Sequence, residues 1–260
     1  MKKKVLALLA TCMLAMSLTA CGGKENTFTV GFDAEFPPYG YMDENGEYVG
    51  FDLDLAAEVC ERNGWELVKR PINWDSKDME LSSGSIDCIW NGFTINGRED
   101  EYTWSSPYVD NSQVFVVAAD AGISAPADLA GLTVGVQRDS SALSALNDEE
   151  APENIALRDS FGSLIEYADY NTAFMDLEAG ALDAVAMDIG VANYQIESRG
   201  DGYVILDEYL ATEQYGVGFL LGNEELRDTV EKTLEEMAAD GTFAEIAEEW
   251  GLSDCICFGK

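Results

Sequence analysis

The stretch LSSGSID at residues 81–87 returns 96 residues later as LEAGALD at residues 177–183. Each copy is typical of a helix end, a glycine that closes the helix and the start of a strand. An apolar run follows each copy, at residues 88–90 and 184–187, as expected of a buried strand. The repeat predicts two α/β lobes of similar construction, although two ordinary helix-to-strand turns could also match by coincidence.

The residues around the first copy alternate between strand-like and helix-like patterns. Apolar and β-branched residues predict strands at residues 27–32, 65–69 and 86–90, and helical spacing predicts helices at 52–63 and 75–83. This β-α-β alternation predicts an α/β fold with a largely parallel sheet.

The ends of the predicted strands indicate where a ligand would bind. Ligands of open α/β sheets bind beyond the carboxyl ends of the strands, which lie here at residues 91–94 and 187–188. Two facing sets of strand ends predict a ligand cleft between two lobes, with hinge crossings at residues 113–118 and 215–220. The resulting boundaries are residues 28–112 and 216–260 for lobe 1 and residues 113–215 for lobe 2.

The composition excludes several classes of function. The chain has 260 residues, of which 49 are acidic and 15 basic, and it lacks histidine, so its formal charge is −34. A phosphate backbone repels such a chain, which argues against nucleic-acid binding. Histidine-containing triads and imidazole metal ligands are excluded. Hydrophobic residues make up 47% of the chain, which is typical of a folded protein rather than a disordered acidic tail.

The first twenty residues have the pattern of a secretory signal peptide, with lysines at positions 2–4 before an apolar run. The sequence LTAC at residues 18–21 resembles the lipobox of bacterial lipoproteins. That resemblance implies a signal peptide at residues 1–20, lipid (palmitate) on Cys21 and a tether at residues 21–27. A plain signal peptide cleaved after Ala20 is the alternative. Cleavage would leave 12 basic and 49 acidic residues, a charge of −37, and no second apolar run of about 18 residues that could span a membrane.

Six cysteines occur, at positions 12, 21, 60, 88, 255 and 257. The first belongs to the predicted signal peptide and the second is the predicted lipid site, so four remain in an exported domain, where disulfides persist. Cys255 and Cys257 lie too close for an unstrained bond, and each could instead pair with Cys60 or Cys88. A metal site is disfavoured because paired C-x-x-C units are lacking. Residues 43–47 favour a hairpin turn over a calcium loop, whose glycine comes later.

Short motifs spread over residues 28–250 resemble the polar amino-acid (family 3) solute-binding proteins of bacterial ABC importers. The motifs in the first half are VGFD at 30–33, FPPY at 36–39, YVGFDLDLA at 48–56, NGFTI at 91–95 with Arg98, and SSPY at 105–108. Those in the second half are LTVGV at 132–136, Ser140-Ser141, Asp188, YGVG at 215–218 and MAADGT at 237–242. The resemblance implies a two-lobed periplasmic-binding-protein-like fold that closes on one amino acid, without a cofactor or metal.

The resemblance also implies a role for individual residues. Arg98 would bind the ligand α-carboxylate with its bidentate guanidinium, and Asp188 would accept hydrogen bonds from the α-ammonium. The other implied ligand contacts are backbone and hydroxyl groups of Gly92, Thr94, Ser140 and Ser141, the rings of Phe36, Trp90 and Phe93, and polar groups of Asp33, Asn91 and Gln137.

Purely structural roles are possible for the same residues. The spacer between Thr94 and Arg98 is one residue shorter than usual in the family, so a tight turn at Asn96-Gly97 has to aim Arg98 inward. Arg98 could instead pair with its acidic neighbours at positions 99 and 100, an interaction worth about 0–1 kcal/mol. Asp188, Ser140 and Ser141 could be helix N-caps, and Phe36, Trp90 and Phe93 could be core residues. Asp52 and Asp54 could cap their helix or interact with its dipole.

The resulting hypothesis is a binding protein and not an enzyme. We expect an exported monomeric lipoprotein, anchored on the outer side of the cell membrane, that delivers an amino acid to an ABC permease and its ATPase subunits. Two further functions fit the same fold: a periplasmic dehydratase-type enzyme, with Asp33 or Glu35 as its acid, and a sensor module that acts through a partner. The aromatic residues slightly favour polar or neutral amino acids, including cystine, over basic amino acids as the expected ligand.

Overall fold

The computed structural model describes residues 26–259. Its strands are β1 (Thr27–Phe32), β2 (Glu35–Phe36), β3 (Gly40–Met42), β4 (Tyr48–Val49), β5 (Glu66–Pro71), β6 (Cys88–Thr94), β7 (Thr103–Trp104), β8 (Val109–Ala118), β9 (Thr133–Gln137), β10 (Ser163–Tyr167), β11 (Ala184–Asp188), β12 (Tyr203–Ile205) and β13 (Ala211–Phe219). Its α-helices are α1 (Phe51–Asn63), α2 (Lys77–Ser82), α3 (Ser141–Leu146), α4 (Pro152–Ser160), α5 (Tyr170–Glu178), α6 (Ile189–Arg199), α7 (Glu224–Asp240) and α8 (Thr242–Glu249). Two 3-10 turns lie at Trp74–Ser76 and Pro126–Leu129.

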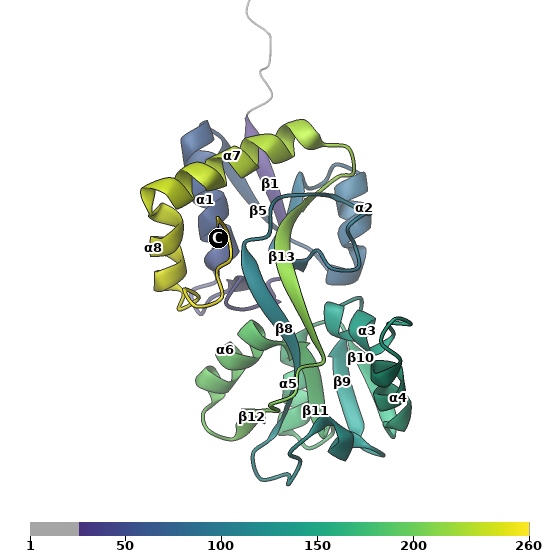
Figure 1. Cartoon of the computed structure of the whole chain (residues 1–260). Helices are drawn as coiled ribbons and strands as arrows, with labels where there is room; N and C mark the ends of the chain where they lie inside the picture. The colour runs from purple at the N-terminus through teal and green to yellow at the C-terminus, as the bar shows by residue number, and fades with distance from the viewer. Residues whose placement is uncertain (1–25, 260) are drawn as a thin grey trace, which may run out of the picture.

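These elements form two α/β lobes, as predicted (Figure 1). Lobe 1, at the top of Figure 1, contains β1 and β5 with α1, α2, α7 and α8 around them. Lobe 2 contains β9–β12 with α3–α6, and the long strands β8 and β13 run from one lobe into the other. The predicted signal peptide at residues 1–20 and the predicted lipid site at Cys21 lie outside the described residues.

One sheet continues through both lobes in the order β10-β9-β11-β8-β13-β6-β1-β5. In lobe 1, β1 is parallel to both β5 and β6, and in lobe 2, β9 is parallel to both β10 and β11. The antiparallel strands β8 and β13 pair with each other at residues 109–113 and 211–215. This pairing ends where the expected crossings begin, because residues 113–117 pair with β11, Ala118 pairs with β12, and β13 pairs with β6 from Tyr215 to Phe219. The lobe boundaries stay a prediction.

The two copies of the sequence repeat have the same local structure. Gly84 and Gly180 both have a φ of 71°, a left-handed value that glycine adopts readily. In each copy the closing aspartate then binds the neighbouring strand. Asp87 Oδ2 accepts a hydrogen bond of 2.7 Å from an N–H of β1, and Asp183 Oδ2 accepts one of 2.8 Å from an N–H of β9. The repeated sequence therefore corresponds to repeated structure.

The element boundaries agree with the predictions within two residues except at two places. Helix α1 ends before Gly64, whose φ of 65° closes it as expected. The helix expected at residues 75–83 is split into a 3-10 turn and α2, because Ser76 leaves helical geometry with φ −109° and ψ 5°. The strand expected at residues 86–90 runs instead over Cys88–Thr94, since its end still pairs with β13.

Cys60 and Cys88 are buried free thiols, so neither forms the disulfide to Cys255 or Cys257 that the sequence allowed. The turn at residues 43–47 joins β3 to β4, with the N–H of Asp43 donating to the carbonyl of Glu47 over 2.8 Å. Within residues 26–259, no group of three acidic or cysteine side chains is arranged to hold a metal ion. The same residues contain no helix that is long and apolar enough to cross a bilayer.

Candidate ligand-binding site

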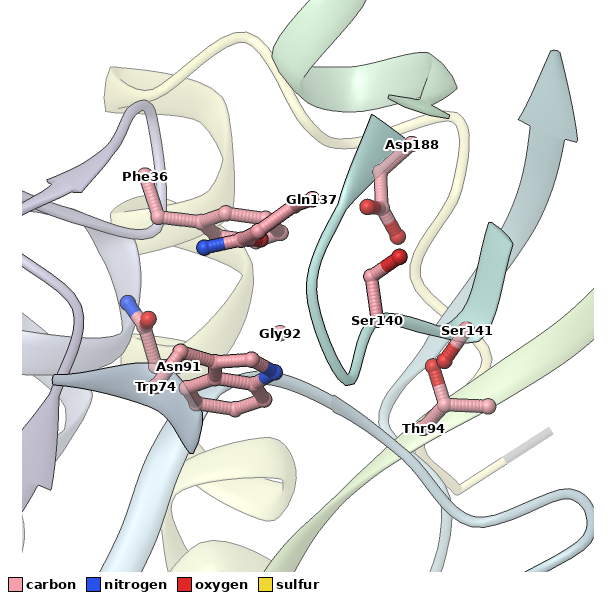
Figure 2. A pocket seen from close by; sticks show the side chains of 9 residues that line it. All are labelled: Phe36, Trp74, Asn91, Gly92, Thr94, Gln137, Ser140, Ser141 and Asp188. Atoms are coloured by element: carbon pink, nitrogen blue, oxygen red, sulfur yellow. The ribbon is translucent and has the colours of Figure 1, made fainter. Parts of the chain in front are cut away.

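A small cavity lies between the lobes, at the ends of β6, β9 and β11 (Figure 2). A water-sized sphere can move its centre through only about 10 Å³ of it, roughly what one water molecule needs, so the cavity is narrow in this structure. The residues that line it are Phe36, Trp74, Asn91, Gly92, Thr94, Gln137, Ser140, Ser141 and Asp188. All of these except Trp74 were implied by the sequence, and the fold brings them together from both lobes.

Aromatic and polar groups occupy different sides of this cavity. Figure 2 shows the rings of Phe36 and Trp74 on one side and the oxygens of Asp188 and Ser140 on the other. Trp74 comes from the 3-10 turn and packs edge-on against Phe93, with ring centroids 5.4 Å apart. Trp74 was not predicted from the sequence, because it precedes an expected helix and belongs to no motif.

Arg98 reaches across the cleft from lobe 1. Its guanidinium donates to Ser141 Oγ over 3.1 Å and to the carbonyl of Thr94 over 3.3 Å, so it joins two cavity-lining residues without lining the cavity itself. The short spacer forms a turn in which the N–H of Arg98 bonds to the carbonyl of Ile95, and Gly97 takes a φ of 79°. No ion pair of Arg98 with an acidic neighbour occurs in the described structure.

The lobe 2 side of the cavity begins at helix α3. Ser140 is its N-cap, and its Oγ accepts a hydrogen bond of 3.2 Å from the N–H of Leu143. The same Ser140 side chain caps the helix and lines the cavity, and its contact with a ligand stays a prediction. Ser141 follows within the helix and uses its hydroxyl to accept from Arg98 instead.

Asp188 ends β11 and precedes α6, yet its side chain makes no capping bond to that helix. Its Oδ1 instead accepts hydrogen bonds of 2.6 Å from both Tyr215 and Gln113, and of 2.9 Å from Asn111. Burial raises the pKa of Asp188, while these donors lower it. A buried carboxylate at the cavity wall can accept hydrogen bonds from a ligand ammonium group.

Asp33 lies beside the cavity, where it is held by both lobes. Its Oδ2 accepts a hydrogen bond of 2.7 Å from Gln137, and its N–H donates to Asn91 over 2.9 Å. Burial is the main reason that the pKa of Asp33 rises to about 6. Asp33 also lines a neighbouring groove, whose other acidic residues are Glu35, Glu80 and Asp169.

Gly92 contributes lobe 1 backbone to the cavity lining. It has a φ of 55°, and an added Cβ would lie 2.9 Å from both the Phe36 and Tyr215 rings, so only glycine fits. Its N–H donates over 2.6 Å to Asp52 Oδ2, which also accepts from Tyr108 over 2.8 Å. Asp52 therefore braces this loop rather than capping α1, and burial raises its pKa to about 7.

Two of the implied aromatic contacts lie elsewhere. Trp90 is completely buried in the core beside Tyr108 and is not among the cavity-lining residues. Phe93 is also buried, against Tyr102 and Trp104, and its ring supports the guanidinium of Arg98 at 5.4 Å. Because Trp90 and Phe93 are three residues apart on β6, they lie on opposite faces of the strand, and each ring packs into a different hydrophobic cluster.

Ion pairs also join the two lobes around the cleft. Lys77 of α2 pairs with Asp139, and Arg138 pairs with Asp75 over 2.8 Å. Lys77 is buried, whereas Arg138 and Asp75 are both exposed. Both ion pairs connect lobe 1 to the segment that follows β9 in lobe 2. The two lobes are therefore closed on each other in this structure.

The sequence is similar to those of several binding proteins. It is 29% identical over 234 residues to the L-cystine-binding protein TcyJ of Escherichia coli (strain K12), which covers 89% of this chain and 85% of that protein. It is 27% identical to ABC transporter arginine-binding protein 1 of the same strain, with 96% of this chain and 99% of that protein covered. The crystal structure of an ABC uptake transporter substrate binding protein from Streptococcus pneumoniae with bound histidine has 33% identity and a TM-score of 0.82, over 90% of this chain and 93% of that chain.

A family model matches most of the chain. Residues 28–253 match the description "Bacterial extracellular solute-binding proteins, family 3". The family and these relatives are binding proteins and not enzymes, so that prediction is confirmed and the dehydratase hypothesis is wrong. The protein therefore belongs to the bacterial extracellular solute-binding proteins of family 3.

Proposed function

We propose that the protein captures an amino acid between its lobes and delivers it to an ABC importer. The observation that carries the proposal is the placement of opposite charges on the two sides of the cleft. Arg98 reaches in from lobe 1, and Asp188 lines the cavity from lobe 2. An amino acid carries one negative and one positive group on the same carbon, so it can engage both lobes at once and hold them closed.

The acidic groove beside the cavity supports a ligand with a second positive group. Asp33, Glu35, Glu80 and Asp169 line this groove, and no lysine or arginine is among its lining residues in the described structure. Arginine, lysine and the second ammonium of cystine would each gain from these carboxylates. This observation moves such ligands ahead of neutral amino acids in the expected order, and the relatives named for cystine and arginine agree with it.

Export and anchoring complete the proposal. The signal-like residues 1–20 and the LTAC sequence support cleavage before Cys21 and attachment of lipid there. The protein then acts as a monomer on the outer side of the cell membrane and docks on a permease coupled to ATPase subunits. Mass spectrometry of the membrane-associated protein tests the anchor. Lipid mass on an N-terminal Cys21 is expected, and a free thiol at that position would contradict it.

A thermal-shift screen over the amino acids tests the ligand. Ligands that bind the native state raise the melting temperature by mass action. A ligand concentration of 100 times Kd adds about 2.7 kcal/mol to the free energy of unfolding. We expect shifts with L-arginine and L-cystine, smaller shifts with L-glutamine and none with L-glutamate, which the acidic groove repels. The decarboxylated amine agmatine is the control for Arg98, since it lacks the α-carboxylate. A screen without any amino-acid shift would contradict the proposed function.

A further inference from the structure

Two buried carboxylates, Asp188 at the end of β11 and Glu213 on β13, lie on the two strands that flank β8. Asp188 is opposite Gln113 in the pairing of β11 with β8, and Glu213 is opposite Asn111 in the pairing of β13 with β8. Because side chains two residues apart share one face of a strand, all four polar side chains project together. Glu213 was not predicted from the sequence, because it lies in none of the family motifs.

Two amide groups connect these carboxylates. The Asn111 amide nitrogen donates to Asp188 Oδ1 over 2.9 Å and to Glu213 Oε1 over 2.7 Å. The Gln113 amide nitrogen donates to the same two oxygens over 2.6 Å and 2.7 Å. Both hydrogens of each amide are used in this way, so the two acids are held as one unit.

One hydroxyl completes the set of donors on each acid. Tyr215 donates to Asp188 Oδ1 over 2.6 Å, and Thr94, from lobe 1, donates to Glu213 Oε1 over 2.9 Å. The Glu213 side chain therefore connects β13 to a residue that lines the cavity. Glu213 itself does not line the cavity, so any effect on a ligand passes through its neighbours.

No cation balances the pair within the described structure. None of the ion pairs among residues 26–259 includes Asp188 or Glu213. The other ionisable groups facing them are the hydroxyls of Tyr39, Tyr170 and Tyr215, whose pKa values burial raises well above the ordinary value, so they stay neutral.

The arginines and the remaining acids of the surrounding elements bind elsewhere. Arg98, after β6, bonds to Ser141 and to a backbone carbonyl, and Arg199, at the end of α6, pairs with Glu178. Asp110, on β8, accepts from Gln214 at the surface. Asp169, before α5, accepts from the N–H of Thr172. Two adjacent buried negative charges without a cation are costly, and a proton is the simplest compensation.

The ionisation behaviour of the pair agrees with this geometry. Burial, followed by the negative charge of Asp188, raises the pKa of Glu213 to about 7, against the lowering effect of its three hydrogen-bond donors. Burial likewise raises the pKa of Asp188. Interacting carboxyl groups lose their protons in steps that belong to the pair, so the second ionisation falls near neutral pH.

We propose that Asp188 and Glu213 share one proton while the cleft is without ligand, and that the arrival of a ligand ammonium beside Asp188 expels this proton into solvent. The inference rests on the proposed function, because it requires a ligand with an ammonium group. The proton passes from the carboxyl pair to water or buffer, the ammonium keeps its own hydrogens, and no covalent bond changes elsewhere. Glu213 is thus a positioning residue that makes amino-acid affinity depend on pH.

The proposal predicts a specific direction for this dependence. Since the ligand binds the fully ionised pair, affinity rises with pH through the neutral range and levels off above it. If one proton is released per ligand, each rise of one pH unit lowers Kd by up to about tenfold, as long as the pH is below the second pKa of the pair.

Calorimetry in phosphate and in Tris buffer counts the released protons, because the two buffers differ in their enthalpy of ionisation. L-arginine and L-cystine are the probes, since neither changes its own charge near pH 7. We expect release of about 0.5–1 proton per ligand at pH 7, and close to zero for Glu213→Gln, which keeps the shape and the acceptor oxygen. Release should persist in Asp52→Asn, which replaces another buried acid near the cleft. Absence of release in the wild type, or equal release in Glu213→Gln, would overturn the proposal.

A second measurement needs no ligand. Carbon NMR of the side-chain carboxyls in ligand-free protein should show a titration near pH 7 that disappears in Glu213→Gln. If both Asp188 and Glu213 titrated only in the ordinary range near pH 4, the shared proton would be refuted. If neither amino acid bound, the proposed function would be contradicted. The NMR titration would still show whether Asp188 and Glu213 hold a proton near pH 7.

Discussion

The two lobes share a frame but present opposite chemistry to the cleft. In lobe 1, Gly31 of β1 leaves room for Ile86, and in lobe 2, Gly135 of β9 leaves room for Leu182. A Cβ on either glycine would lie 2.4 Å or 2.5 Å from the end of that neighbouring side chain. The repeated glycine allows the segment after each helix to pack tightly against the central strand of its lobe.

The difference lies in the few residues beyond the strand ends. Lobe 1 brings the guanidinium of Arg98 and the amide of Asn91, whereas lobe 2 brings the carboxylate of Asp188, the hydroxyl of Ser140 and the amide of Gln137. The repeated helix-to-strand structure therefore fixes where a ligand can lie. The residues beyond the strand ends differ between the lobes, and they determine which group of the ligand faces which lobe. The cleft is asymmetric although the scaffold is repeated.

Removal of the positive charge from the lobe 1 side should have the largest effect. We expect Arg98→Ala to reduce amino-acid affinity by at least about 30-fold, because loss of one member of a desolvated charge pair costs about 2–5 kcal/mol. Calorimetry with L-arginine and L-cystine measures the change, and an unshifted melting temperature without ligand shows that the fold is intact.

Arg138→Ala is the matched control for this variant. Arg138 also reaches the other lobe, but its partner Asp75 and its own side chain are exposed, so the pair is worth about 0–1 kcal/mol. Affinity should change by less than about fivefold. Equal losses in the two variants would show that Arg98 acts only as a contact between lobes.

Alanine at the repeated glycines should have an intermediate effect on both lobes. Gly31→Ala and Gly135→Ala each force a side chain to move, and overpacking of this kind costs about 1–3 kcal/mol of unfolding free energy. Urea denaturation measures the loss. Gly202→Ala is the control, since it has open space around its Cβ and no positive φ, and it should change stability by less than about 0.5 kcal/mol. A loss of unfolding free energy in only one of the two variants would show that the two glycines do not have the same role in their lobes.

The smallest expected effect is a dependence of stability on pH. The pKa values of Asp33, Asp52 and Glu213 are raised to about 6, about 7 and about 7, so the native protein holds protons that the unfolded chain releases between about pH 4 and 7. The free energy of unfolding should therefore fall as pH rises through this window and change little above it. The melting temperature should decrease by about 2–4 °C for each kcal/mol lost.

Asp52→Asn separates the lobe 1 contribution to this dependence. Asparagine keeps an oxygen that can accept from Gly92 and Tyr108 but does not ionise. The fall in melting temperature between pH 5 and pH 8 should become smaller in this variant. An unchanged fall would mean that Asp52 is ionised throughout this range in the native protein.

Local patterns were sufficient to predict much of the fold. Strand β1 has its predicted boundaries, α1 ends before Gly64, and the repeated turns were visible as similar strings. These features depend on residues close in sequence, through periodicity and the left-handed preference of glycine. Trp90 could not be assigned from sequence, because the two faces of β6 are both buried and only the packing shows which one meets the cleft.

The sequence alone determined the class of protein, the two-lobed frame and most of the residues that line the cavity, because these are written in short motifs and in a repeat. Only the tertiary structure decided that Trp74 faces the cavity, that Asp52 braces Gly92, and that Glu213 joins Asp188. Each of these contacts joins segments that are distant in the chain, and the pKa of a carboxyl group depends on the burial and charges that such contacts create. The net charge of −34 does not indicate which of the 49 acids lie together, whereas the pairing of β8 with β11 and β13 brings Asp188 and Glu213 onto the same two amide groups.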